Sequence, residues 1–209
     1  MAFDAAMIHP RPHDLLLVSD AVVTGAAPPW VHAALQATPW AVVRRGSAPP
    51  DHVAIGVRGP DRSHRHATTV ACGRIRRIAT PETLAQLVPP QRDVPAIVAL
   101  HRIRTRMQTL GLPWGPTGSV GFELASGVPT ATPDSDLDLV IRVDDLSAPT
   151  LGRLTNAHNM FERLPTRVDC QVELPGGAVA LAELLSGQSD VLARTCAGPR
   201  LAAPADLLR

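Results

Sequence analysis

Gly118-Ser119 and the segment Asp134-Ser135-Asp136-Leu137-Asp138-Leu139-Val140-Ile141 carry the pattern from which the architecture of this chain follows. Side chains alternate between the two faces of a β-strand, so Asp136 and Asp138 lie on one face of this segment. The other face is apolar and suits a hydrophobic core, with Leu137, Leu139 and Ile141. We therefore predict a strand over residues 135–143 that is packed on one face and open to chemistry on the other.

The open face of this strand suits a hard cation and a phosphate ester. Asp136 and Asp138 would lie roughly 7 Å apart at Cα. Their carboxylates could thus converge on one or two Mg²⁺ ions, which in two-metal sites lie about 3.5–4 Å apart. Gly118 lets a phosphate approach the backbone, Ser119 adds a hydroxyl, and the N-terminus of a following helix adds positive partial charge. The sequence predicts a magnesium site beside a phosphate cradle.

An isolated Asp-x-Asp is a weak signal, and a strand with hydrated carboxylates is the alternative interpretation. Two neighbours favour a site: Gly118-Ser119 upstream, and Asp169, which takes the corresponding solvent-facing position on a strand predicted over residues 167–174. In that strand the apolar residues at 168, 170 and 172 would face inward. The three aspartates therefore form the candidate catalytic and metal-binding set.

Two other motifs are excluded by position. A calcium loop of EF-hand type starting at Asp134 would need Gly at its sixth and Glu at its twelfth position, which hold Leu139 and Asp145. A serine-hydrolase elbow around Ser119 would need Gly where Thr117 stands. No serine nucleophile is expected in this chain.

Composition excludes further classes of protein. All 20 basic residues are Arg, so the chain lacks the Lys that P-loop enzymes, protein kinases and pyridoxal enzymes require. Aromatic residues make up 3% and Tyr is absent, which disfavours nucleic-acid binding. No apolar run approaches the roughly 20 residues of a membrane span, and the N-terminus lacks a secretory pattern. We expect a cytoplasmic protein whose three widely spaced cysteines form neither a disulfide framework nor a zinc site.

The order of predicted elements indicates an α+β protein with two domains. A small α+β domain is expected over residues 1–90 and a larger one over 91–209, with the boundary near Pro89-Pro90. Strands are predicted at 15–18, 40–45, 52–58, 135–143, 167–174 and near 191–195, with a short strand and turn over residues 114–119. Helices are predicted from 29 to 35, 94 to 110, 120 to 125, 149 to 164 and 178 to 185, and a short helix with a linker is predicted over residues 81–93.

Gly-Ser, Asp-x-Asp and a third Asp on a neighbouring strand resemble the nucleotidyltransferase superfamily of polymerase-β type. This resemblance implies a mixed-sheet nucleotidyltransferase core in the C-terminal part, with the smaller α+β domain before it. Phe122-Glu123 stands where the superfamily often has basic residues.

Longer strings resemble one family in particular, the malonate decarboxylase holo-[acyl-carrier-protein] synthases, or phosphoribosyl-dephospho-CoA transferases. They are Arg11–Leu16, Trp114–Leu124, Ser135–Leu139 and Asp169–Glu173. The resemblance implies transfer of phosphoribosyl-dephospho-CoA from 2'-(5''-triphosphoribosyl)-3'-dephospho-CoA to a serine of the malonate decarboxylase acyl carrier protein. Diphosphate is released.

The resemblance also implies a role for each candidate residue. Asp136 and Asp138 would hold Mg²⁺, and Gly118 and Ser119 would bind the distal phosphates. Asp169 would complete the metal site or accept the proton of the incoming serine. Candidate arginines for the donor or the carrier are Arg58, Arg74, Arg76 and Arg142. Two alternatives stay open: an adenylyltransferase that uses ATP on the same core, and a non-catalytic module that binds a carrier protein.

Overall fold

The computed structural model of this chain describes residues 9–19, 27–59, 61 and 64–209. The chain divides into two compact units, Met1–Thr80 and Pro81–Arg209. Together they contain helices, an antiparallel sheet and a mixed sheet, so the predicted α+β class is confirmed. In the described part no helix has the length and apolar character needed to cross a membrane.

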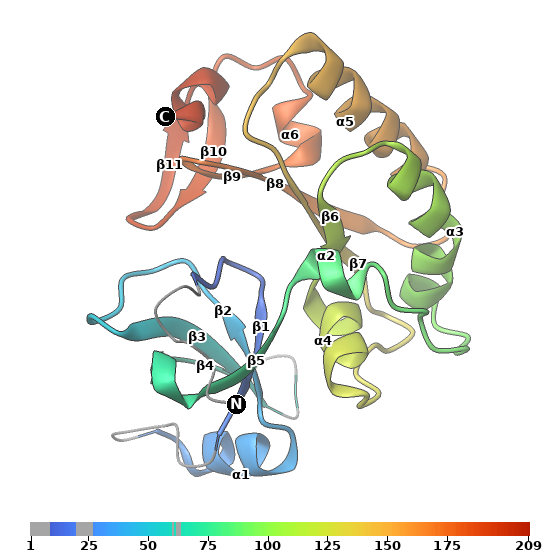
Figure 1. Ribbon diagram of the computed structural model, residues 1–209. Helices are drawn as coiled ribbons and strands as arrows, with labels where there is room; N and C mark the ends of the chain where they lie inside the picture. Colours follow the sequence, from blue (N-terminus) through green and yellow to red (C-terminus); the bar gives the residue numbers. More distant parts are fainter. Residues whose placement is uncertain (1–8, 20–26, 60, 62–63) are drawn as a thin grey trace. The chain divides into compact units, whose positions relative to one another are not determined.

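The first unit contains a five-stranded antiparallel sheet in the order β4-β3-β2-β1-β5, and α1 is the α-helix of its described residues (Figure 1). Its elements are β1 (Leu15–Val18), α1 (Pro29–Ala37), β2 (Trp40–Val43), β3 (His52–Arg58), β4 (Arg65–Ala71) and β5 (Ile75–Ala79). The strands bury a small core centred on Leu16 and Ile55, neither of which is exposed at all. The strands expected at 15–18 and 52–58 are confirmed.

The second unit is built on a six-stranded mixed sheet in the order β11-β10-β9-β8-β7-β6. Its strands are β6 (Trp114–Pro116), β7 (Leu137–Arg142), β8 (Val168–Leu174), β9 (Gly177–Ala180), β10 (Val191–Thr195) and β11 (Gly198–Ala202). Its helices are α2 (Pro81–Leu84), α3 (Pro95–Thr109), α4 (Gly118–Ser126), α5 (Ala148–Phe161) and α6 (Leu181–Leu184). Only β7 and β8 run parallel; every other neighbouring pair is antiparallel. The predicted mixed-sheet core lies in this unit.

The division between the units comes earlier than the sequence suggests. The Pro89-Pro90 pair predicts a boundary at residue 90, whereas the units part after Thr80. Helix α2 belongs to the second unit because it packs against β6. The start of α2 sits so close that a Cβ at Gly115 would come within 1.8 Å of the Pro81 carbonyl oxygen.

Two strands near the C-terminus were not anticipated. A helix was predicted over residues 178–185, but Gly177–Ala180 is strand β9, and α6 begins only at Leu181. Strand β9 folds back on β8 because Pro175 and Gly176 close a tight hairpin, with Leu174 opposite Gly177. Short apolar runs such as this one fit a strand and a helix equally well. Strand β11, the partner of the predicted strand β10, was also missed.

Candidate active site

The predicted phosphate cradle is the connection between β6 and α4. The backbone N–H of Thr117 donates to the carbonyl of Asp138, at 2.9 Å, which anchors the turn to strand β7. Gly118 then adopts a left-handed conformation with φ of 57°. A Cβ at this position would lie 1.8 Å from Oδ2 of Asp138, so the aspartate carboxylate packs directly against the glycine backbone. Only glycine satisfies both the torsion angle and the close approach.

Helix α4 presents its N-terminus beside this carboxylate. Its first intrahelical hydrogen bond is donated by Gly121 to the Thr117 carbonyl at 2.8 Å. The N–H groups of Gly118, Ser119 and Val120 precede that bond, which is the arrangement that binds phosphate at helix N-termini. Gly118 is exposed, whereas Ser119 is 8% exposed. An anion can therefore reach the turn from solvent.

The parallel pairing of β7 and β8 brings two of the predicted aspartates side by side. Asp138 is the register partner of Asp169, so both carboxylates project from the same face on strands about 4.8 Å apart. Asp136 immediately precedes β7, whose first residue is Leu137. All three aspartates are half-buried. The structure thus gathers Gly118, Asp138 and Asp169 at one end of the mixed sheet, with Asp136 at the entrance to β7.

The oxygen chemistry of this set fits Mg²⁺, which prefers carboxylates together with substrate phosphates. In the described part of the chain, however, no group of three or more His, Cys, Asp or Glu side chains is arranged to hold a metal ion. The adjacent pair Asp138 and Asp169 is the part of the set that the sheet register brings together. Such a pair leaves positions for substrate phosphate and water, as magnesium sites in phosphoryl-transfer enzymes do.

Glu123 is a residue of this region that sequence reasoning noted only as an unusual neighbour of Gly-Ser. It lies on α4, is 5% exposed, and accepts two hydrogen bonds of 2.6 Å from Arg92. It also accepts the backbone N–H groups of Thr130 at 2.8 Å and Ala131 at 2.9 Å. Glu123 therefore ties the cradle helix to the loop that leads into β7. The sequence signal that could have identified Glu123 is a charged residue at a buried position of helix α4.

Replacement of Glu123 should loosen this connection. Burial by itself would raise the pKa of Glu123, but hydrogen bonds from Arg92, Thr130 and Ala131, with the Arg92 charge, lower it below 4.5 overall. Its stabilising effect is therefore complete above pH 4.5 and is lost as the pH falls through the folded-state pKa. We expect Glu123→Gln to lower the free energy of unfolding at pH 7 by about 2 kcal/mol.

Urea denaturation from pH 3 to pH 7 checks this expectation. The difference between wild type and Glu123→Gln should shrink on acidification, since the wild-type carboxylate becomes neutral as well. Glu162→Gln is the control, because Glu162 is exposed at the end of α5. A Glu123 variant as stable as wild type at pH 7 would contradict the anchoring role.

Arg142, a candidate for donor binding, has a different role. It follows Asp138 on the same face of β7, but it is 8% exposed and pairs with Glu82 of α2 at 2.5 Å. Arg142 and α2 therefore cover the far end of the face, and the open part lies around Asp138. The other candidates, Arg58, Arg74 and Arg76, belong to the first unit.

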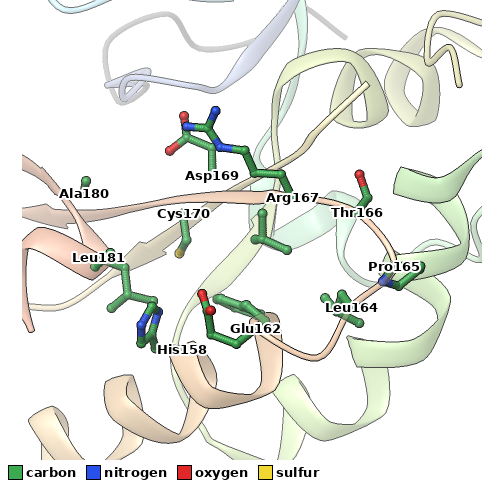
Figure 2. A pocket seen from close by; sticks show the side chains of 13 residues that line it. His158, Glu162, Leu164, Pro165, Thr166, Arg167, Asp169, Cys170, Ala180 and Leu181 are labelled. Atoms are coloured by element: carbon green, nitrogen blue, oxygen red, sulfur yellow. The ribbon is translucent and has the colours of Figure 1, made fainter. Parts of the chain in front are cut away.

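A pocket of about 510 Å³ lies near the start of β8, between α5 and α6. Figure 2 shows His158 and Glu162 on one side of it, with Cys170 projecting towards them from β8. Arg167 and Asp169 project away from this group, to the other side of the strand. Asp169 thus contributes to the lining where β8 begins, while its carboxylate belongs to the opposite face. The pocket is not part of the phosphate cradle.

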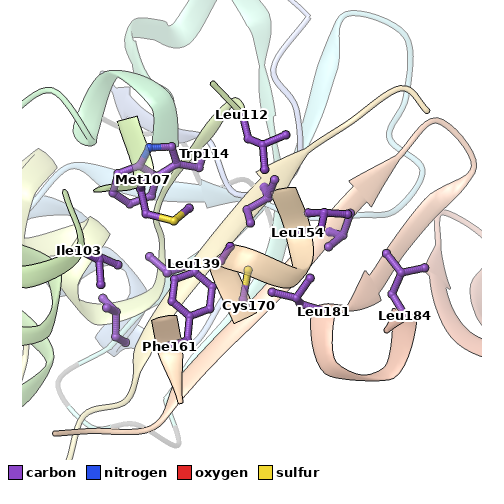
Figure 3. Packing of buried hydrophobic residues seen from close by; sticks show 14 of the residues in the cluster. Ile103, Met107, Leu112, Trp114, Leu139, Leu154, Phe161, Cys170, Leu181 and Leu184 are labelled. Carbon is purple, nitrogen blue, oxygen red and sulfur yellow. The ribbon is translucent and has the colours of Figure 1, made fainter. Parts of the chain in front are cut away.

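The face of β7 and β8 behind the carboxylates forms the main core. Figure 3 shows Leu139 and Cys170 packed among side chains from α3 and α5, including Met107 and Phe161. Burial, and then the charge of Asp169, raise the pKa of the Cys170 thiol far above its ordinary value, so this cysteine stays protonated. The predicted alternation is therefore confirmed: apolar residues face the helices and the aspartates face away.

Family models match both units of the chain. The model described as phosphoribosyl-dephospho-CoA transferase MdcG C-terminal domain matches residues 83–205. The model described as the N-terminal domain of the same transferase matches residues 11–81. The border between the two matches agrees with the division of the structure after Thr80.

Curated proteins similar to this chain carry the same description. A phosphoribosyl-dephospho-CoA transferase of Pseudomonas aeruginosa is 46% identical over 195 residues, which cover 92% of this chain and 91% of the relative. One from Azotobacter vinelandii is 39% identical, with 92% of each chain covered. One from Pseudomonas putida is 38% identical, covering 92% of this chain and 93% of the relative. No solved structure matches the chain.

Proposed function

Because this chain belongs to the phosphoribosyl-dephospho-CoA transferase family of MdcG type, we propose that it attaches that group to a carrier protein. The donor is 2'-(5''-triphosphoribosyl)-3'-dephospho-CoA, and the acceptor is a serine of the acyl carrier protein of malonate decarboxylase. Diphosphate is the second product, and the reaction takes place in the cytoplasm. The observation that carries this proposal is the placement of Asp138 between the Gly118 turn and Asp169.

The cradle binds the triphosphate end of the donor. Backbone N–H groups at the start of α4 and the Ser119 hydroxyl donate to the two phosphates that will leave. Gly118 has no side chain, so the phosphates can approach the backbone beside Asp138. This arrangement directs the phosphorus nearest the ribose towards the Asp138 and Asp169 carboxylates.

The transfer breaks a phosphoanhydride bond of the donor and forms a phosphodiester with the serine of the carrier. The serine oxygen of the carrier attacks the phosphorus attached to the ribose, and the bond from that phosphorus to the leaving diphosphate breaks. Asp169, on the strand beside Asp138, takes the proton of the serine hydroxyl or contributes to the metal site. The N-terminus of α4 stabilises charge on the departing diphosphate.

Asp138 and Asp169, which the register brings together, are the pair that would hold Mg²⁺, and Asp136 would have to approach them from the entrance to β7 to act as a third ligand. When bound, the ion would neutralise charge on the phosphates and on the leaving oxygen. The nearest carboxylates in the register, Asp138 and Asp169, carry negative charge on the same face. A dianionic pair would repel a triphosphate unless a cation lay between them.

Transfer is therefore expected to depend on a divalent cation. Removal of metal with EDTA, followed by buffer exchange, should reduce the rate to background, and added Mg²⁺ or Mn²⁺ should restore it. The rate of carrier modification in a titration with MgCl₂ measures this dependence. Undiminished transfer in excess chelator would overturn the role of the aspartates as metal ligands.

Diphosphate release tests the proposed reaction and separates it from ATP-dependent adenylyl transfer. The enzyme is mixed with Mg²⁺, apo carrier protein, and either triphosphoribosyl-dephospho-CoA or ATP. We expect diphosphate release with the first donor, and none when the acceptor serine of the carrier is replaced by Ala. Diphosphate release with ATP alone as the donor would favour an adenylyltransferase, and binding of the carrier without release would favour a non-catalytic module.

A further inference from the structure

The face of the mixed sheet that carries the carboxylates continues across β9, where Ala178 is buried, to the exposed strands β10 and β11. Asp169 and Glu173 lie four positions apart on β8, so their side chains share one face of the sheet. Paired residues in neighbouring strands also share a face, and Glu173 pairs with Ala178 on β9. Ala178 pairs in turn with Arg194 on β10. Arg194 and the residues that share its face therefore lie on the same side of the sheet as Asp138 and Asp169.

Strands β10 and β11 expose an apolar cluster on this face. Leu192 and Leu201 are direct cross-strand partners, and they are 44% and 71% exposed. Pro199, the partner of Arg194, is exposed beside them. We call Leu192, Arg194, Pro199 and Leu201 the β10–β11 patch. Paired leucines at the edge of a sheet are seldom left exposed to solvent, and such an apolar cluster indicates an interaction surface.

The charge of the β10–β11 patch is positive. Arg194 is exposed, and among the described residues it has no ion-pair partner. On the path from Arg194 towards Asp169, strand β9 contributes only the small side chains of Ala178 and Ala180 to this face. A partner seated on the patch would therefore meet no bulky side chain on β9 between Arg194 and β8.

We propose that the β10–β11 patch docks the carrier protein that receives the group. The proposal rests on the proposed function and adds the place at which the acceptor binds. Along the sheet, the phosphate cradle follows β6, Asp138 lies on β7, Asp169 on β8 and the patch on β10 and β11 (Figure 1). The donor thus occupies the β6–β7 end, the acceptor occupies the β10–β11 end, and the carboxylate of Asp169 lies between them.

The distance from β8 to the patch, and the charge and apolar character of the patch, suit a small acidic domain. Three strand spacings of about 4.8 Å separate β8 from β11, which is about 14 Å. A domain of about 100 residues has a radius of gyration of about 13 Å, so it can rest on the patch while its serine reaches Asp169. Its contact surface would pair a carboxylate with Arg194 and cover Leu192 and Leu201 with apolar side chains.

Two variants test the docking site, each with a matched control. Leu201→Asp removes the more exposed leucine of the patch, and Val88→Asp is its control, because Val88 is also 71% exposed but lies in the loop after α2. Arg194→Glu reverses the charge of the patch, and Arg163→Glu is its control, because Arg163 is exposed beyond the end of α5. Circular dichroism and thermal melting establish that all four variants fold.

Binding of apo carrier protein is measured by calorimetry, and the KM values for carrier and donor are measured separately. We expect Leu201→Asp and Arg194→Glu to raise the carrier Kd and carrier KM by about tenfold or more. The KM for triphosphoribosyl-dephospho-CoA should stay within twofold of wild type, and both controls should behave as wild type. High salt should weaken carrier binding to wild type more than to Arg194→Glu.

The binding measurement separates failure of this inference from failure of the proposed function. If the wild-type protein binds the carrier through the patch but adds no group to it, the proposed reaction is contradicted and the docking site is supported. Carrier affinity unchanged in both patch variants would overturn the docking site, even if transfer proceeds. A wild-type dimer that Leu201→Asp dissociates, with the carrier Kd unchanged, would assign the patch to a second copy of this chain and also overturn the inference.

Discussion

Asp138→Asn is expected to reduce transfer to the carrier by about 10³-fold or more while the protein remains folded. The side chain keeps its size, and the backbone carbonyl of residue 138 still accepts the Thr117 N–H. What is lost is one negative charge at the point where the Gly118 turn and Asp169 meet. Loss of a metal-binding carboxylate of this kind removes about 4 kcal/mol of transition-state stabilisation.

Single-turnover transfer at saturating donor, with Mg²⁺ varied, measures the effect. Asp144→Asn is the matched control, because Asp144 is an exposed aspartate just beyond the other end of β7. It should transfer the group at the wild-type rate. Asp136→Asn should also be inactive, since Asp136 stands at the entrance to the same strand. Normal turnover in Asp138→Asn would refute the metal assignment.

Gly118→Ala should impair transfer by about 10²-fold and should also destabilise the protein. A residue other than glycine in the left-handed region costs about 1–2 kcal/mol. At position 118 the new methyl group would also meet Oδ2 of Asp138 at 1.8 Å, so the turn or the carboxylate must move. A displacement of about 1 Å in a catalytic group is enough for a loss of about 10²-fold.

Gly127→Ala separates strain of the backbone from displacement of the carboxylate. Gly127 caps the other end of α4 with φ of 73°, and a Cβ there would meet nothing within 4 Å. Both variants should lose stability, but only Gly118→Ala should lose transfer. If Gly118→Ala fails to fold, Gly118→Ala/Asp138→Ala removes the two closest contacts, with Oδ2 at 1.8 Å and Cγ at 2.6 Å, and should recover part of the stability without activity. Full transfer by Gly118→Ala would show that the close approach of Asp138 is not needed.

The sequence predicted the strand faces that carry the candidate residues, because the signals for these faces are local. Alternation of Asp and Leu in β7 fixes which side chains face the core, and a glycine before a helix marks the turn at Gly118. The same alternation placed Asp169 on the outer face of β8. That Asp138 and Asp169 are register partners could not be read from the sequence, because the register depends on how α5, the helix that connects the two strands, packs against the core.

The errors near the C-terminus have a different cause. Ala178-Val179-Ala180 is too short and too uniformly apolar to distinguish a strand from a helix, and its pairing with β8 decides the outcome. The anchoring role of Glu123 could not be predicted, because its partners, Arg92 and the backbone at 130–131, are distant along the chain. The pairing of Arg142 with Glu82 could not be predicted, because the two residues are 60 positions apart and Glu82 lies in the segment 1–90 that the sequence assigns to the first domain.

The most direct measurement is the intact mass of the apo malonate decarboxylase carrier protein after incubation with this enzyme, Mg²⁺ and triphosphoribosyl-dephospho-CoA. We expect a mass increase equal to one phosphoribosyl-dephospho-CoA group, with fragmentation placing it on a serine. The increase should be absent with Asp136→Asn or Asp138→Asn. An unmodified carrier after incubation with folded wild-type enzyme, or full modification by either variant, would contradict the account.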